Sequence, residues 1–206
     1  SYNFALMASQ ICLKKKRAVV AYLQPVKASC RATLENIMYE IFDNAPPSVK
    51  PRYNNQKSAW VFPNGSEIRV GGTDKGIHEK LRGPQYDMCI IDEAGFVECP
   101  LEYLLTGILV PGTLLTRGKI VLSSTTPAEP DHDFLEYLKA CHSRNAALTK
   151  TIFDVLADCE ETKAEYALKG EPFPNESYNL TSEMVGDIIK AYPGGVKNEN
   201  FMREYL

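Results

Sequence analysis

Two adjacent carboxylates offer the clearest chemistry in this sequence. Asp92 and Glu93 directly follow residues 88–91, a short apolar run that is typical of a strand buried on both faces. In an open parallel sheet, ligands bind just beyond the carboxyl ends of the strands. Because two neighbouring acids repel each other, something must balance their charge, and Mg²⁺ bound to nucleotide phosphates would do so.

The two carboxylates can take different roles, because successive side chains of a strand point in different directions. One can hold a metal ion through water, while the other orients and deprotonates an attacking water molecule. Taken alone, an Asp-Glu pair is equally well explained as a strand followed by an acidic turn. A second group of polar residues is therefore needed to favour a site.

That second group is a run of hydroxyl side chains. Residues 119–123 predict another buried strand, and it leads into the run Ser123-Ser124-Thr125-Thr126-Pro127. Four hydroxyls at the end of an inner strand can hydrogen-bond a phosphate, an attacking water or Glu93. Alone, the run is better explained as a turn before proline. Acids and hydroxyls that end neighbouring strands together favour a site.

The elements that must position these residues alternate between helix and strand. Apolar residues at helical spacing predict helices over 2–13 and 26–42, and a continuous apolar run predicts a buried strand over 18–23. Asn64-Gly65 predicts a hairpin turn between strands over 58–62 and 66–71. This order predicts an α/β fold whose mainly parallel sheet is covered by helices.

The second half of the chain predicts more helix than strand. A helix is expected over 101–109, ended by Pro111-Gly112, and a further strand over 148–155. Asp158 is expected to begin a helix that Gly170 ends, and Thr181 to begin the next one.

Composition excludes several classes of protein. The net charge of −3 excludes a histone-like basic protein but leaves room for a local basic groove. No apolar run reaches the roughly 18 residues of a membrane span. The six cysteines form no Cys-x-x-Cys pair, which excludes a zinc ribbon and indicates a reducing, cytosolic environment.

The order of the motifs carries a resemblance to a known family. The residues that carry it are Tyr22-Leu23-Gln24-Pro25, Leu81-Arg82-Gly83, the run from Tyr86 to Ala94, the run from Ser123 to Pro127, and the closing run from Asn200 to Leu206. Together they resemble the ATPase domain of the large terminase subunit, the DNA-packaging motor of tailed bacteriophages. The likeness covers nearly the whole chain and is strongest from 81 to 127.

The resemblance implies a fold and a role for each matching residue. The fold would be a three-layer P-loop NTPase domain of the RecA-like ASCE class, and the cofactors would be ATP and Mg²⁺. Asp92 would hold Mg²⁺ and Glu93 would be the catalytic base. Ser124, Thr125 and Thr126 would sense the nucleotide and couple it to DNA movement. Arg82 would contact the nucleotide or a neighbouring subunit, or hold its own loop, which we weight higher.

One family motif is missing. The sequence has no G-x-x-x-x-G-K-[ST], and the run from Gly71 to Gly76 has the residue types in the wrong order. We therefore expect a domain that lacks its first strand and its P-loop. Because Ser1 begins a predicted helix, our hypothesis is that Ser1 is the metal-binding hydroxyl of a truncated P-loop. Without a complete P-loop, the fragment is expected to be inactive alone.

The resemblance also implies domains, partners and location. Residues 1–155 would form a partial ATPase core, and 156–206 a helical part leading to an absent nuclease domain. The partners would be double-stranded DNA, the viral portal, the small terminase subunit and further copies in a ring. The place would be the cytoplasm of the infected bacterial host, with no membrane involved.

Two alternatives stay open at this point. A helicase-like nucleic-acid ATPase of superfamily two also carries an Asp-Glu pair and a Ser/Thr motif, but would need a second RecA-like domain. A non-enzymatic α/β interaction module would use Asp92 and Glu93 only as capping acids.

Overall fold

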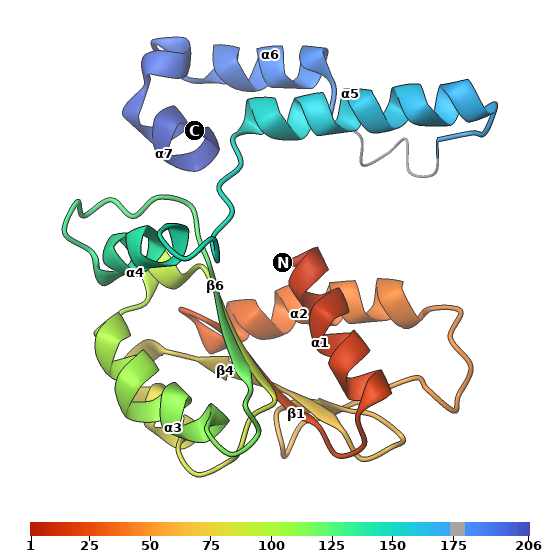
Figure 1. The fold of residues 1–206 in the computed structure, drawn as a ribbon, viewed down its shortest axis with the longest axis vertical. Helices are drawn as coiled ribbons and strands as arrows, with labels where there is room; N and C mark the ends of the chain where they lie inside the picture. Colours follow the sequence, from red (N-terminus) through yellow and green to blue (C-terminus); the bar gives the residue numbers. More distant parts are fainter. Residues whose placement is uncertain (174–179) are drawn as a thin grey trace. The chain divides into compact units, whose positions relative to one another are not determined.

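The computed structural model describes residues 1–173 and 180–206, apart from the side chains of residues 75 and 77 (Figure 1). It contains two compact units. The sheet unit comprises residues 1–124 and 131–135, and the helical unit comprises residues 125–130 and 136–206. The helical part predicted over 156–206 includes residues 174–179, which lie outside the described residues.

The sheet unit is built on a six-stranded sheet. Its strands are β1 (Val19–Gln24), β2 (Arg52–Asn54), β3 (Ala59–Val61), β4 (Glu67–Gly72), β5 (Met88–Asp92) and β6 (Lys119–Ser123). The order across the sheet is β2-β3-β4-β1-β5-β6, with β4, β1, β5 and β6 parallel. The expected hairpin is present as antiparallel β3 and β4, and β2 adds an outer strand that the sequence did not predict.

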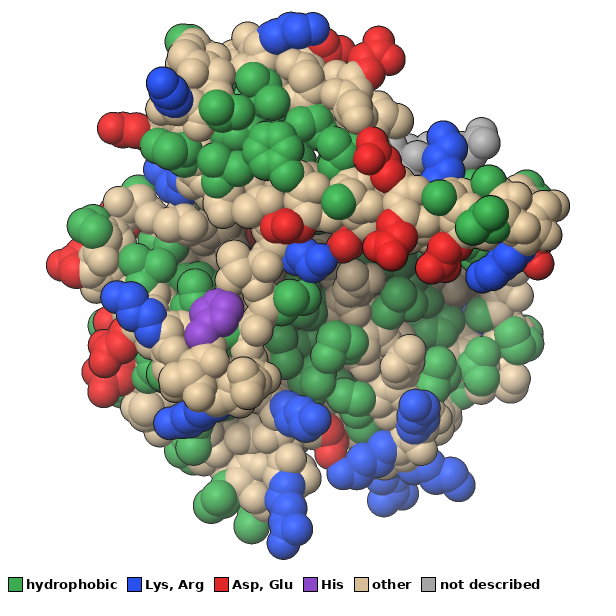
Figure 2. Space-filling model, turned by 45° about the horizontal axis from the view of Figure 1, so that its top comes forward, with side chains coloured by type: hydrophobic (Ala, Val, Ile, Leu, Met, Phe, Trp, Pro, Cys, Tyr) green, Lys and Arg blue, Asp and Glu red, His purple; other side chains and the backbone are tan. Residues whose placement is uncertain are grey.

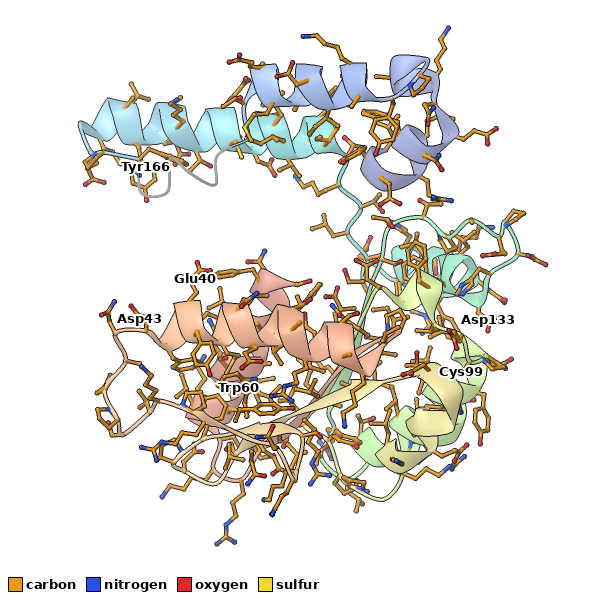
Figure 3. All side chains as sticks on the ribbon, turned by 180° about the vertical axis from the view of Figure 1, so that it is seen from behind. Glu40, Asp43, Trp60, Cys99, Asp133 and Tyr166 are labelled. Atoms are coloured by element: carbon orange, nitrogen blue, oxygen red, sulfur yellow. The ribbon has the colours of Figure 1, made fainter. Side chains whose placement is uncertain are left out.

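Helices α1 (Tyr2–Lys14) and α2 (Lys27–Phe42) cover one face of this sheet (Figure 1). Their apolar stripes pack on alternate strand residues, which share a face because the side-chain period of a strand is two. Tyr22, Ile68 and Ile90 lie in this core with Leu34. Trp60 lies between α2 and the sheet, 5.5 Å from the ring of Tyr39 (Figure 3).

Shorter helical segments lie on the other side of the sheet (Figure 1). They are the 3₁₀ helix η1 (Asp74–Leu81), the π-helix η3 (Tyr103–Leu109) and α3 (Val110–Thr113). The expected helix end at Pro111 was wrong, since helical structure continues to Thr113. Pro111 lies inside this continuous helical run, and the carbonyl four residues before it, that of Gly107, accepts a hydrogen bond from Arg82 instead.

The fold class expected from the sequence is confirmed: three layers are arranged around a mainly parallel sheet. One strand, β6, differs from expectation. Strand β6 was expected to be buried, yet Ile120 to Ser123 are only half-buried and Lys119 is exposed. The reason is its position at the end of the sheet, where it pairs with β5 alone within the described residues. After β6, α4 (Asp133–His142) follows.

The helical unit contains α5 (Ile152–Lys169), α6 (Ser182–Ala191), the 3₁₀ turn η5 (Gly195–Lys197) and α7 (Glu199–Tyr205). Its small core gathers around Phe201, which is fully buried, with Ile152 and Val185. The strand expected over 148–155 was wrong, because α5 begins at Ile152, well before the expected helix start at Asp158. Its end at Gly170, with φ of 67°, agrees with expectation.

Among the helices of the described residues, none is both long and apolar enough to cross a lipid bilayer.

Candidate functional site

Asp92 is the centre of the candidate site. It is the last residue of β5, and only 2% of it is exposed. Its Oδ2 atom accepts three hydrogen bonds, from Ser1 Oγ at 2.6 Å, Tyr22 Oη at 3.0 Å and Gln24 Nε2 at 3.1 Å. Strand β1 supplies two of these donors because it pairs with β5, and the start of α1 supplies the third.

The donors around Asp92 are neutral. Burial raises the pKa of Tyr22, and the charge of Asp92 raises it further, so the phenol stays protonated and donates. Asp92 forms no ion pair with any Lys, Arg or His of the described residues. A buried carboxylate without a cationic partner is costly, so this position fits a cation.

The residues present also indicate how such a cation would be held. Within the described part of the chain, no three His, Cys, Asp or Glu side chains gather as a metal cluster. Mg²⁺ suits this situation, since it is commonly bound through one or two carboxylates, waters and substrate phosphates. Asp92 would be the carboxylate, and the hydroxyl of Ser1, already bonded to it, would be a second oxygen ligand.

Glu93 follows in an unusual backbone conformation. Its φ of 60° and ψ of 43° place it in the left-handed region, which costs a non-glycine residue about 1–2 kcal/mol. The turn Ala94–Phe96 follows it, and Phe96 N donates to Glu93 O. The left-handed turn gives Glu93 a direction different from that of Asp92, and Glu93 is half-buried whereas Asp92 is buried. Strain of this kind often marks functional sites.

The hydroxyl run divides between the two units. Strand β6 pairs with β5 so that Ser123 is opposite Asp92, and Ser124 Oγ accepts a hydrogen bond from Gly95 N at 3.0 Å. Ser124 is thus brought to the turn that carries Glu93. Thr125 and Thr126 belong to the helical unit, where Thr126 N donates to Arg203 O.

Arg82 is engaged in a network of its own. Its guanidinium donates to Glu79, to the carbonyl of Gly107 and to the hydroxyl of Tyr103. Tyr103 in turn donates to Glu79 Oε1 at 2.5 Å. These bonds join the loop before β5 to the π-helix. The geometry therefore favours the loop-holding role that we weighted higher.

The glycine run from Gly71 to Gly76 does not form a phosphate-binding turn. Gly71 and Gly72 are the last residues of β4, and a Cβ atom at either would come within 2.5 Å of a neighbouring atom. Gly72 leaves no room for a side chain, because a Cβ atom there would lie 2.6 Å from the backbone N of Lys27 at the start of α2. Close packing explains these glycines.

Sequence reasoning missed the roles of Tyr22 and Gln24. Both residues were noted as part of the family resemblance, but no function followed from them. A signal was present in the sequence. Tyr22 and Gln24 carry polar groups at alternate positions of an otherwise apolar strand, so both side chains lie on one face of the sheet. Their target became visible only when β1 was seen to pair with β5.

Comparison with known proteins gives one family. The family model "Terminase large subunit, T4likevirus-type, N-terminal" matches residues 1–183. A comparison with curated proteins gave no significant match.

Similar solved structures agree with this family. The large terminase of a thermophilic bacteriophage has a TM-score of 0.68 at 12% identity, covering 100% of this chain and 43% of its own. The same terminase in complex with ADP has a TM-score of 0.65 at 12% identity, covering 94% of this chain and 41% of its own. The ATPase domain of the Thermus phage P74-26 large terminase has a TM-score of 0.51 at 16% identity, covering 66% of this chain and 57% of its own.

At these identities the neighbours show the fold, and this chain spans less than half the length of the first of these terminases. The fold is that of these large terminases and of a large terminase ATPase domain. With the family model matching most of its length, the chain belongs to the large terminase subunit family, in its N-terminal, T4-like type.

Proposed function

We propose that this chain is the ATPase motor domain of a viral packaging terminase. The reaction is hydrolysis of the β–γ phosphoanhydride of ATP, and it drives double-stranded DNA into a procapsid. The observation that carries the proposal lies at the carboxyl edge of β5 and β6, where Ser1 donates to Asp92 and Ser124 accepts a hydrogen bond from the turn that follows Glu93. The structure of the thermophilic-phage terminase in complex with ADP supports a nucleotide as the ligand.

Each residue at this edge has a proposed task. Mg²⁺, when bound with the nucleotide, would neutralise phosphate charge and draw electrons from the bond that breaks. Asp92 would hold the metal, with its carboxylate oriented by Tyr22 and Gln24. Glu93 would accept the proton of the attacking water. Ser124, which is bonded to the turn after Glu93, would report the state of the site to the segment that contains Thr125 and Thr126.

Ser1 is proposed as the hydroxyl that ends a P-loop. Its Oγ is 2.6 Å from the carboxylate proposed to hold the metal, at the start of a 13-residue helix. The amide groups at a helix start attract phosphate. The residues that precede Ser1 in the parent reading frame test the idea directly. We expect Gly-Lys there, and any other pair would rule out this assignment.

The wider assembly is also part of the proposal. Partners would be double-stranded DNA, the portal, the small terminase subunit and further copies of the chain in a ring, in the cytoplasm of the infected bacterial host. Residues 1–155 would serve as the ATPase core and 156–206 as its C-terminal helical part. Membership of the terminase family favours this over a superfamily-two helicase or an interaction module.

The experiment is a substitution of the proposed base in the parent protein. Glu93→Gln removes the proton acceptor and keeps the size of the side chain. Hydrolysis of ATP should fall by about 10²–10⁴-fold while ATP still binds. Glu98→Gln is the matched control, because Glu98 is an exposed acid in the segment that follows the site. A Glu93→Gln protein that hydrolyses ATP at the wild-type rate would refute the assignment.

A further inference from the structure

Six exposed cations surround the amino edge of the sheet, where the parallel strands begin. Four are the run Lys14-Lys15-Lys16-Arg17, which leads from the last residue of α1 towards β1. The other two are Arg117 and Lys119, which stand just before and at the start of β6. We call these six residues the amino-edge cluster. It lies at the opposite end of the strands from Asp92.

Contacts within the fold connect the members of the cluster. Lys15 forms an ion pair with Asp87, the residue before β5, and Lys119 N donates to the carbonyl of Asp87. The strand register places Lys119 opposite Met88, which is opposite Val20. The start of β1, which follows the run Lys14-Lys15-Lys16-Arg17, is thus two strand spacings from the start of β6, or about 10 Å. Cations at these two places can contact different phosphates of one duplex.

The acids at this edge do not neutralise the cluster. Asp87 is 10% exposed and is occupied by Lys15 and by the backbone N–H of Val19. Glu67 is 8% exposed and is paired with Lys57 and Arg69. Of the six cluster residues, only Lys15 forms an ion pair within the described part of the chain. Five positive charges are therefore available to a partner.

The positive charge is local. Residues 1–124 contain fifteen Lys and Arg against eleven Asp and Glu, a net charge of +4, whereas residues 125–206 carry −7. Figure 2 shows Lys and Arg side chains gathered along the lower margin of the molecule, where few acidic side chains appear. A chain that is acidic overall thus presents one basic edge.

We infer that the amino-edge cluster contacts the phosphate backbone of duplex DNA. Exposed Lys and Arg on turns bind phosphates without reading bases, which suits a motor that must move DNA of any sequence. The inference rests on the proposed function and names the surface that holds the substrate. Because the cluster and Asp92 lie at opposite ends of the strands, DNA and nucleotide bind without competing for the same residues.

The test compares two triple variants that change the net charge equally. The edge variant is Lys16→Gln, Arg17→Gln and Lys119→Gln. The control variant is Lys139→Gln, Lys163→Gln and Lys197→Gln, three exposed lysines of residues 125–206. Affinity for a labelled duplex of about 30 base pairs is measured by fluorescence anisotropy between roughly 50 and 200 mM salt.

The edge variant should bind the duplex about tenfold or more weakly at the lower salt concentration, and its slope of log affinity against log salt should be smaller by about 2.7, or 0.9 for each lost phosphate contact. The control variant should stay close to the wild type. The conservative variant Lys16→Arg with Lys119→Arg should also keep the wild-type affinity, because it keeps both charges. Thermal melting of all variants checks that they fold.

Three results would overturn the inference. One is an equal loss of affinity in the edge and control variants, which would indicate only a net-charge effect. Another is no binding of duplex DNA by the wild type at low salt. The third is stronger binding of a poly-glutamate chain than of DNA, which would point to an acidic protein partner. None of these results concerns hydrolysis, so the assignment of Glu93 is tested separately.

Discussion

Inside the fold, neutral donors surround the Asp92 carboxylate. An ion pair with Lys or Arg would have compensated a carboxylate within the protein and left less attraction for a metal ion. Donors from Ser1, Tyr22 and Gln24 instead fix the direction of the carboxylate and all bond the same oxygen. At the residue scale, this arrangement supports the proposed cation site over a simple acidic turn.

Removing one of these donors should weaken the fold measurably. Tyr22→Phe keeps the buried ring and deletes only the hydroxyl, so Asp92 loses a hydrogen bond to a charged acceptor. The free energy of unfolding, measured by urea denaturation, should fall by about 1.5–3 kcal/mol. Tyr39→Phe is the control, since Tyr39 is 57% exposed. Equal stability of the two variants would mean that the Tyr22 bond contributes nothing.

The left-handed conformation of Glu93 gives a second prediction at this scale. Glu93→Ala and Glu93→Gly both remove the carboxylate, but only alanine keeps a Cβ atom that is strained at a φ of 60°. The glycine variant should therefore be more stable than the alanine variant by about 1 kcal/mol, as measured by chemical denaturation. An alanine variant of equal or greater stability would show that the turn is not strained.

At the scale of elements, α5 shows where local sequence signals compete. Ile152, Phe153 and Val155 favour a strand by their side-chain types, and the prediction followed them. Thr151 and Asp154 form a capping box instead, each side chain accepting a hydrogen bond from the backbone N–H of the other. Two satisfied donors at a helix start outweigh a weak strand preference, and Ile152 still reaches the core beside Phe201.

The same cap predicts a pH dependence. Hydrogen bonds from Thr151 hold the pKa of Asp154 below its ordinary value of 3.8. A lowered pKa in the folded state adds stability above the unfolded value, and this stability is lost as the pH falls through the folded pKa. Helix α5 should therefore lose stability below a pH of about 3.8, when Asp154 is protonated.

The measurement is a comparison with a variant that cannot titrate. Melting temperatures of the wild type and Asp154→Asn are followed by circular dichroism from neutral pH downwards. The advantage of the wild type should shrink as the pH falls below that value, because the two side chains then carry the same charge. A difference that stays constant with pH would argue against the charged cap.

For the whole molecule, the order of strands was the part that the sequence could predict only in outline. Continuous apolar runs gave β1, β5 and β6, and Asn64-Gly65 gave the β3–β4 hairpin. The position of β1 between β4 and β5 depends on tertiary packing, which no local pattern contains. For that reason the sequence predicted Asp92 and Glu93 as site residues, but it did not predict that Tyr22 and Gln24 would contact Asp92.

Burial of the cysteines makes a prediction for the folded chain as a whole. Burial raises the pKa of Cys12, Cys30 and Cys89 to about 12, so these thiols stay protonated and unreactive at a pH of about 8. Cys141 and Cys159 are only half-buried. Iodoacetamide should label these two in the folded protein and all six in denaturant, as read by mass spectrometry. Rapid labelling of Cys12, Cys30 or Cys89 in the folded protein would contradict the packing.

Asp92 and Glu93 are proposed to do different work at one nucleotide site. The most direct measurement is the affinity of the parent protein for ATP, with and without Mg²⁺, in Asp92→Asn and Glu93→Gln. We expect Asp92→Asn to lose most of the Mg²⁺-dependent gain in affinity, whereas Glu93→Gln should keep that gain and lose only hydrolysis. Identical behaviour of the two variants, or no effect of Mg²⁺ on the wild type, would contradict it.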